Sequence, residues 1–157
     1  EEIELIFKTK PGNDVLVSRQ DVNNPLSSYS KFGFHLDDAD WPSAEHYYQA
    51  MKFEDDAIRE KIRQASHPMD TPKLSKQHKK QIRKDWDRIK VSVMTRGTYI
   101  KCRTHQEVAS ALLKTGDKKI VENSQYDYYW GCGRDGLGKN TYGKVLMDIR
   151  EKLAELE

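Results

Sequence analysis

The chain has 157 residues, of which 36% are hydrophobic and 33% are charged. This length fits one hydrophobic core, so we predict a single domain over residues 1–157. The 27 basic and 25 acidic residues leave a net charge of +2. The overall charge therefore does not indicate a protein that binds nucleic acid or anionic membranes.

Two cysteines, Cys102 and Cys132, are too few and too far apart for a disulfide framework or a zinc knuckle. No C-x-x-C or H-E-x-x-H pattern occurs, so we expect neither a metal site nor a cofactor. No apolar run is long enough to cross a bilayer and no signal-like segment is present. The expectation is therefore a cytoplasmic protein without a membrane partner.

The first part of the chain predicts short strands. Residues 3–8 and 14–18 each predict one strand, and the letters PGN between them are a turn signal. Aromatic and polar residues alternate over residues 29–38, which predicts a further strand that leads into the first helix.

The first helix begins after Pro42, with Ser43 as its N-cap, and we predict that it runs to residue 53. Residues 55–66 predict a second helix, which the two prolines of residues 67–73 end.

Apolar residues between positions 82 and 100 recur mostly at helical spacings, which predicts one long helix or two helices joined near Gly97. A capping-box pattern that starts at Thr104 and a stop at Gly116 predict a short helix between them.

The last third of the chain predicts a strand over residues 119–123, a glycine-punctuated loop over residues 126–143 and a helix over residues 144–156. Short strands come first and helices follow, without a regular alternation of strand and helix. The predicted fold class is therefore α+β, helix-rich, with a few short strands.

The stretch WPSAEHYYQAMKF places several polar groups against apolar residues. On a helical wheel Glu45 and Lys52 nearly superpose at the border of the apolar side, and Gln49 lies just beyond them. An acid, an amide and an amine would then form a row flanked by Tyr48, as at the edge of a cleft. A surface row on an amphipathic helix has the same spacing, so both interpretations stay open. We expect His46 to face solvent or to make a local hydrogen bond.

The glycine-rich loop contains GCGRDG and GRDGLGKN, which are close to two nucleotide-binding patterns. Neither follows a buried apolar strand, and the second lacks the hydroxyl that would bind magnesium, so we reject both interpretations. The loop can still bind a ligand, because its glycines let backbone amides approach closely. Lys139 and Asn140 add donors, and Tyr128, Tyr129 and Trp130 offer faces on which a base could stack.

Three segments together resemble the NADAR family of YbiA-like proteins. They are WPSAEHYYQAMKF, RKDW at residues 83–86 and YDYYWGCGRDGLGKNTYGKVLMDIR, and the resemblance extends over residues 29–153. The chain departs from the family pattern at Lys31, where members usually carry asparagine between serine and phenylalanine. It also has Cys132 where many members have an acid, so we expect no catalytic acid there.

The resemblance implies a YbiA-like fold and hydrolysis of N-glycosidic bonds. YbiA-like members cleave ribose 5-phosphate from aminopyrimidine intermediates of riboflavin synthesis, whereas other NADAR members remove ADP-ribose from guanine in nucleic acid. The expected partner is thus a small phosphoribosyl or ADP-ribosyl substrate, with nucleic acid possible. A module that binds ADP-ribose or NAD without catalysis is the alternative from another functional class.

Two chemical routes fit the residues. Glu45 and Asp127 can act as a pair of carboxylates around an oxocarbenium-like transition state. In the second route the amine of Lys52 attacks C1 of the ribose and forms an imine, as the resemblance implies for the lysine of this motif. Glu45 would then move the proton, and Asp127 would bind the ribose hydroxyls or serve as a second acid.

The other predicted site residues bind the substrate. Tyr48 flanks the row of polar groups and Gln49 is the amide within it, and Trp86 and Trp130 would frame the base or the sugar. Phosphate or ribose oxygens would contact Gly138, Lys139 and Asn140. The basic run from Lys73 to Lys84 would guide a nucleic acid, if the substrate is one.

Overall fold

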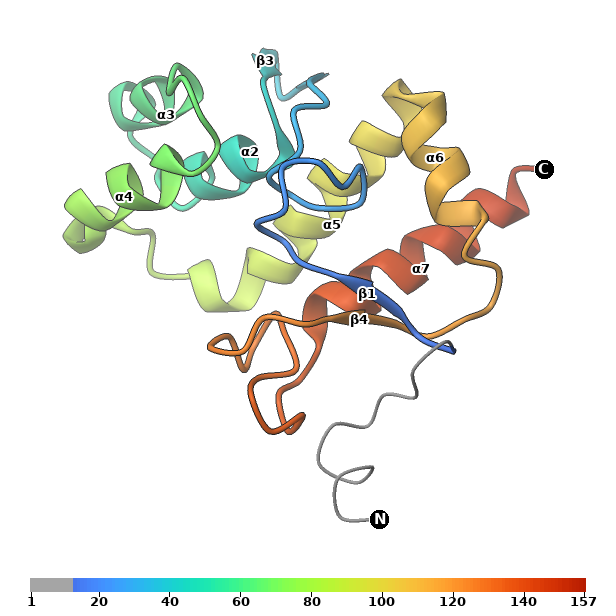
Figure 1. Ribbon diagram of the computed structural model, residues 1–157. Helices are drawn as coiled ribbons and strands as arrows, with labels where there is room; N and C mark the ends of the chain where they lie inside the picture. The colour runs from blue at the N-terminus through green and yellow to red at the C-terminus, as the bar shows by residue number, and fades with distance from the viewer. Residues whose placement is uncertain (1–12) are drawn as a thin grey trace. The chain divides into compact units, whose positions relative to one another are not determined.

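The computed structural model describes residues 13–157 of the chain (Figure 1). The strand predicted over residues 3–8 lies outside them. The described part holds six α-helices, a 3-10 helix at Lys79–Gln81 and four short strands, so the predicted helix-rich α+β class is confirmed. Contacts divide the chain into two compact units, one of residues 13–27 with 107–157 and one of residues 28–106. The single domain over residues 1–157 stays a prediction.

The first unit is built on a parallel pair of strands. Strand β1 (Val15–Val17) pairs with β4 (Ile120–Glu122), so that Val15 lies opposite Ile120 and Val17 opposite Glu122. Helix α7 (Thr141–Glu155) packs along β4 (Figure 1). It buries one face through residues at helical spacings, namely Tyr142, Leu146, Ile149 and Leu153.

Helix α6 (Gln106–Leu113) begins one residue later than a cap at Thr104 predicts. Thr104 is the last residue of the preceding helix, and its hydroxyl donates to the carbonyl of Ile100 instead of capping a new helix. The predicted cap is therefore wrong. The stop is confirmed, because Gly116 follows the helix with a φ of 65°, which a residue without a Cβ adopts at no steric cost.

The second unit contains a hairpin that the sequence analysis missed. Strand β2 (Phe34–Leu36) pairs antiparallel with β3 (Ala39–Trp41), whereas we predicted one strand over residues 29–38. The turn consists of Asp37 and Asp38, with φ values of 53° and 61°. Left-handed residues at both central positions are typical of the two-residue turn that matches the twist of a hairpin.

Helix α2 (Ala44–Ala50) is the central helix of this unit. Ser43 is its N-cap, as predicted, but the helix ends three residues before position 53. Helices α3 (Asp56–Arg63), α4 (Asp70–Gln77) and α5 (Trp86–Thr104) contact it, and all seven of its residues are buried (Figure 1). The interpretation of its polar residues as a surface row is therefore wrong.

The break in the long helical region lies at residues 82–85, not near Gly97. Pro72 sits in the first turn of α4, where the helix needs no backbone N–H from it. Gly97 lies within α5, and a Cβ there would come 2.9 Å from Cδ2 of Tyr47. The glycine thus lets α5 approach α2 closely instead of ending a helix.

Within residues 13–157 no helix is both long enough and apolar enough to span a bilayer. The same residues contain no cluster of three or more histidine, cysteine or acidic side chains that could hold a metal ion.

Candidate active site

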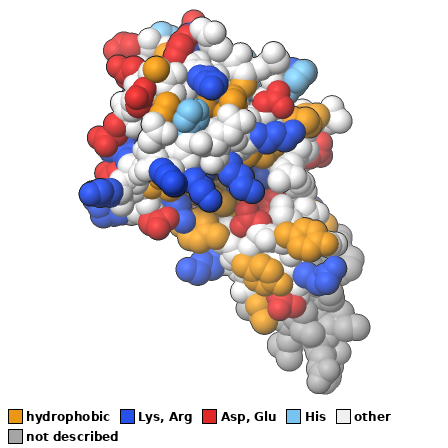
Figure 2. Space-filling view, turned by 90° about the vertical axis from the view of Figure 1, so that its left-hand side faces the viewer, with side chains coloured by type: hydrophobic (Ala, Val, Ile, Leu, Met, Phe, Trp, Pro, Cys, Tyr) orange, Lys and Arg blue, Asp and Glu red, His pale blue; other side chains and the backbone are white. Residues whose placement is uncertain are grey.

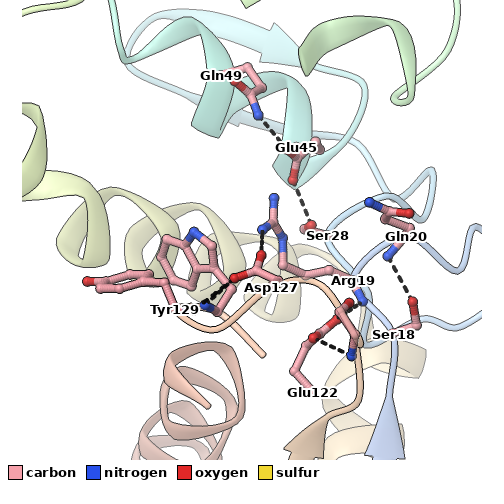
Figure 3. Close-up of polar contacts among 11 residues, drawn as sticks. Ser18, Arg19, Gln20, Ser28, Glu45, Gln49, Glu122, Asp127 and Tyr129 are labelled. Carbon is pink, nitrogen blue, oxygen red and sulfur yellow. Dashed lines mark hydrogen bonds and ion pairs between the residues drawn. The ribbon is translucent and has the colours of Figure 1, made fainter. Parts of the chain in front are cut away.

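Glu45 lies in the first turn of α2 and is completely buried. Its Oε1 accepts a hydrogen bond of 2.7 Å from the hydroxyl of Ser28, and its Oε2 accepts one of 2.7 Å from Nε2 of Gln49 (Figure 3). The backbone N–H of Glu45 also donates to the carbonyl of Ser28, at 2.9 Å. Hydrogen bonds of this kind hold a buried carboxylate in one orientation.

Gln49 is 4% exposed and carries an unsatisfied acceptor. Its Oε1 is buried and has no hydrogen-bond partner among the described residues. Because buried polar atoms are nearly always paired, an unpaired oxygen beside the Glu45 carboxylate fits a site that receives a donor from a ligand. A substrate hydroxyl or amino group would supply such a donor.

Lys52 is not on the helix that the sequence predicts for it. Helix α2 ends at Ala50, and Lys52 occupies the turn that follows, half-buried. Its Nζ lies 5.5 Å from the centroid of the Tyr48 ring, and that ring packs against Trp86 at 5.1 Å between centroids. Amine and aromatic rings therefore come together, while the predicted row of Glu45, Gln49 and Lys52 on one helix face does not exist.

The segment before α5 is attached to this turn. The backbone N–H of Arg83 donates to the carbonyl of Lys52 at 2.8 Å. The Arg83 guanidinium binds both carboxylate oxygens of Asp85, at 2.6 and 3.1 Å, and lowers the pKa of that carboxyl. This pair fixes the segment from which Trp86 starts α5.

His46 makes local hydrogen bonds, which is one of its two predicted outcomes. Its Nδ1 lies 2.7 Å from the hydroxyl of Ser43, and its Nε2 lies 2.9 Å from the carbonyl of Ala65. Burial lowers the pKa of this imidazole, so it is neutral at pH 7 and donates from Nε2. His46 thus links α2 to the end of α3.

In the first unit, Asp127 organises the turn that leads to Trp130. Its Oδ1 accepts from the backbone N–H of Tyr129 at 3.0 Å and of Trp130 at 2.8 Å (Figure 3). Its Oδ2 lies 3.7 Å from Nη1 of Arg19, and the Arg19 guanidinium lies 5.5 Å from the centroid of the Trp130 ring. Asp127 therefore stabilises this turn, whether or not it also takes part in catalysis.

A cavity of about 630 Å³ opens beside these residues. The end of β1 and the loop after β4 line it, through Ser18, Arg19, Gln20, Ser124, Gln125, Tyr126, Asp127, Tyr128 and Tyr129. Sequence reasoning missed Arg19, which lies more than a hundred residues from Asp127 and belongs to no motif. An arginine, a carboxylate and exposed tyrosine rings suit a polar ligand with a flat ring.

Sequence reasoning also missed Glu122, the last residue of β4. It is 1% exposed, and its carboxylate accepts from the backbone N–H of Arg19 at 2.7 Å. It also accepts from the N–H and the hydroxyl of Ser124, at 2.9 and 2.7 Å. The carboxylate thus ties β1 to the start of the glycine-rich loop.

The predicted phosphate contacts have different environments. Asn140 is buried with a φ of 53°, and its amide bonds the N–H of Glu122 and the carbonyl of Ile120, at 2.8 and 2.9 Å. Gly138 packs so tightly that a Cβ would collide with the carbonyl of Gly131. Both residues hold the loop on β4. Lys139 is exposed, with Nζ 5.6 Å from the centroid of the Tyr129 ring.

Residues 16–154 match the family model described as the NADAR domain. The chain belongs to the NADAR family. It is 41% identical over 134 residues to an N-glycosidase of Nostoc punctiforme, and the aligned region covers 83% of this chain and 86% of that protein. It is also 39% identical over 137 residues to N-glycosidase YbiA of Escherichia coli, and this alignment covers 87% of this chain and 86% of the relative.

The fold of this NADAR chain is also found in a solved structure. The NMR structure of E. coli YbiA matches it with a TM-score of 0.82 and 36% identity, over 95% of this chain and 90% of that one. The predicted family, YbiA-like fold and enzyme class, an N-glycosidase, are therefore confirmed. These relatives favour the enzyme over a non-catalytic module.

Another relative is named for riboflavin biosynthesis. A riboflavin biosynthesis protein of Vibrio vulnificus is 42% identical over 115 residues, which make up 73% of this chain and 31% of that longer protein.

Proposed function

We propose that this NADAR N-glycosidase hydrolyses the ribose C1–N bond of phosphoribosylated aminopyrimidines of riboflavin biosynthesis and releases ribose 5-phosphate. The observation that carries the proposal is the buried Glu45 carboxylate, fixed by Ser28 and Gln49 beside an unpaired amide oxygen. The names of the riboflavin-related relative and of the N-glycosidases support the substrate class.

In the proposed mechanism the amine of Lys52 attacks C1. The C1–N bond to the base breaks as the new bond from C1 to Nζ forms, and the departing nitrogen takes a proton. The sugar ring then opens, because its C1–O bond breaks as the imine forms and the proton of Nζ passes to the ring oxygen. Water hydrolyses this imine to free the sugar and the lysine. The amine must first lose its proton, although the Tyr48 face favours the ammonium form. We assign that proton transfer to Glu45, a completely buried acid of the same unit.

We also propose binding roles for residues of the first unit, taken by itself. Asp127 would accept from the ribose hydroxyls, since its Oδ2 is not used by the turn. Lys139 is an exposed cation of the glycine-rich loop and would bind phosphate. Trp86 and Trp130, with Tyr48, would supply faces for the base or the sugar.

Borohydride trapping tests the proposal. The protein is incubated with ribosylaminopyrimidine phosphate, reduced, and its intact mass recorded; we expect a sugar adduct that Lys52→Ala abolishes and Lys61→Ala retains. Lys61 is an exposed lysine of α3 and serves as the matched control. Release without an adduct would support the route through Glu45 and Asp127, and no release would contradict the substrate assignment.

A second candidate substrate is ADP-ribosylated guanine in nucleic acid, favoured by a basic surface. Five exposed lysines follow one another along α4 and the segment after it, at positions 73, 76, 79, 80 and 84. Lysine and arginine side chains gather on the face that carries α4 (Figure 2). A cleft of about 430 Å³ lies there, lined by Glu54, Lys80, Gln81, Ile82, Arg83, Lys84 and Asp85. Such a surface would bind the phosphates of a nucleic acid strand.

Salt-dependent affinity separates the two substrates. Replacing Lys79, Lys80 and Lys84 with glutamine should weaken binding to ADP-ribosylated single-stranded DNA and flatten its salt dependence, if nucleic acid is the substrate. The matched control replaces Lys61, Lys144 and Lys152, which removes the same charge elsewhere. Equal affinities in both triple variants would exclude this surface as the nucleic-acid site. The cytoplasmic location stays a prediction.

A further inference from the structure

Lys101 is a completely buried lysine in the last turn of α5. Its Nζ donates a hydrogen bond of 2.8 Å to the hydroxyl of Ser30 and lies 5.7 Å from the centroid of the Phe32 ring. One turn further on, Nε2 of His105 contacts the carbonyl of Gly33 at 2.6 Å. The end of α5 thus holds the segment of residues 30–33.

This segment is continuous with the residue that holds Glu45. Ser28 and Ser30 are 0% and 1% exposed, and only Tyr29 separates them along the chain. Ser28 contacts Glu45 through both its hydroxyl and its carbonyl, whereas Ser30 accepts from Lys101. A short buried strap, which we define as residues 28–30, therefore links the amine of Lys101 to the carboxylate of Glu45.

Fold stability does not explain an amine at this place. Burial lowers the pKa of Lys101 to about 7, which means that the environment disfavours the charged form. An apolar side chain of similar length would fill the same volume without that cost. What the amine provides, and an apolar side chain could not, is the hydrogen bond to the strap.

We propose that Lys101 is a positioning residue of the glycosidase, because it fixes Ser30 and thereby the Ser28 hydroxyl that orients the Glu45 carboxylate. The inference rests on the proposed role of Glu45. Lys101 does not react itself, since its amine is enclosed and engaged with Ser30. Removing the amine leaves the Ser30 oxygen buried without its donor, and the strap rearranges to satisfy it.

The experiment is a double-variant cycle of Lys101→Met and Ser30→Ala with two readouts. Each single variant should lower kcat about 10- to 100-fold with little change in KM, because a misplaced catalytic group slows the chemical step. The double variant should be no slower than Lys101→Met, since both changes break one link. Arg103→Met, an exposed change on the same helix, should leave kcat unchanged.

Crystal structures provide the readout that needs no substrate. In Lys101→Met and in Ser30→Ala we expect the distance from Ser28 Oγ to Glu45 Oε1, now 2.7 Å, to exceed 3.5 Å. An unchanged distance, or additive losses in kcat, would overturn the proposal. If Lys101→Met does not fold, Ser30→Ala tests the same link. An inactive wild-type protein would instead contradict the proposed function, and the crystal structures would still decide the role of Lys101.

Discussion

Glu45 shows how one residue type acquires a chemical task through its neighbours. Glutamate at the first turn of a helix is common because the helix dipole favours it there. Here the side chain is buried and held from both sides by Ser28 and Gln49. Its burial and fixed orientation, and not its position in the helix, distinguish it from an ordinary first-turn acid.

We expect Glu45→Gln to lower kcat by about 10²- to 10⁴-fold, because the amide cannot accept the proton of an attacking amine. The isosteric change should leave the folded structure intact, as judged by circular dichroism and thermal unfolding. Glu60→Gln, on the exposed side of α3, is the control and should retain full turnover. Full activity in Glu45→Gln would remove the acid from the mechanism.

Asn140 provides a second prediction at the scale of one residue. Asn140→Ala removes two hydrogen bonds to buried backbone groups of β4 and keeps a positive φ, so it should cost about 2–4 kcal/mol of unfolding free energy. Asn140→Gly loses the same bonds but relieves the φ, so it should be about 1 kcal/mol more stable than Asn140→Ala. Urea unfolding of both variants measures the difference, and equal values would contradict the argument.

At the scale of elements, α2 is defined by the helices around it. Three helices enclose it, and α5 approaches closely enough that Gly97 faces the Tyr47 ring. That ring cannot move away easily, because it is buried and its hydroxyl donates to Asp37 at 2.8 Å.

Gly97→Ala should therefore destabilise the protein by about 1–2 kcal/mol, although alanine is the better helix former. The gain in helix propensity, about 1 kcal/mol, offsets part of the clash. Ser92→Ala lies on the exposed side of the same helix and should be neutral or slightly stabilising. Chemical denaturation of both variants compares them, and a stabilised Gly97→Ala would show that α5 can shift.

The contact between α2 and the end of α3 depends on a neutral histidine. Since the pKa of His46 is lower in the folded than in the unfolded protein, the unfolded state binds the proton first on acidification. The contribution of His46 to stability should be full above pH 6.5 and should be lost as the pH drops below that value. Unfolding free energies between pH 7 and 5 measure the slope, which His46→Gln should reduce, and an unchanged slope in this variant would contradict the assignment to His46.

For the molecule as a whole, two adjacent buried groups set the stability at alkaline pH. The pKa of Lys101 is about 7 instead of 10.5, so between these values only the unfolded state holds the proton and stability rises with pH. Burial raises the pKa of Cys102 from 9.0 to about 11, so above pH 9 the unfolded state loses a proton that the folded state keeps. The two effects oppose each other from pH 9 upward.

We therefore expect the unfolding free energy to rise by about 2–3 kcal/mol from pH 7 to 9 and to level off above pH 9. Urea titrations at intervals of half a pH unit, under reducing conditions, would trace this curve. Lys101→Met should abolish the rise, and Cys102→Ala should extend it beyond pH 9. A flat curve in the wild-type protein would show that the amine is more solvated than its burial indicates.

Local patterns predict most of the elements of this chain. The cap at Ser43, the stop at Gly116, strands β1 and β4, the final helix and the helix-rich α+β class follow from propensities and spacings within a few residues. The polar segments also suffice to identify the family, because their order and spacing recur in it. Two wrong predictions also have local causes. The predicted strand over residues 29–38 is in part a hairpin, because Asp37 and Asp38 form its turn. The predicted helix break near Gly97 is absent, because this glycine allows close packing against Tyr47.

Only the tertiary structure decides what the polar residues do. Spacing places Glu45 and Lys52 on one helix face, but α2 ends at Ala50, between them. Ser28, Arg19, Glu122 and Lys101 belong to no recognisable pattern, since their partners lie 17 to 103 residues away along the chain. Burial and long-range hydrogen bonds depend on how segments pack, and a sequence pattern read along one segment does not contain that information.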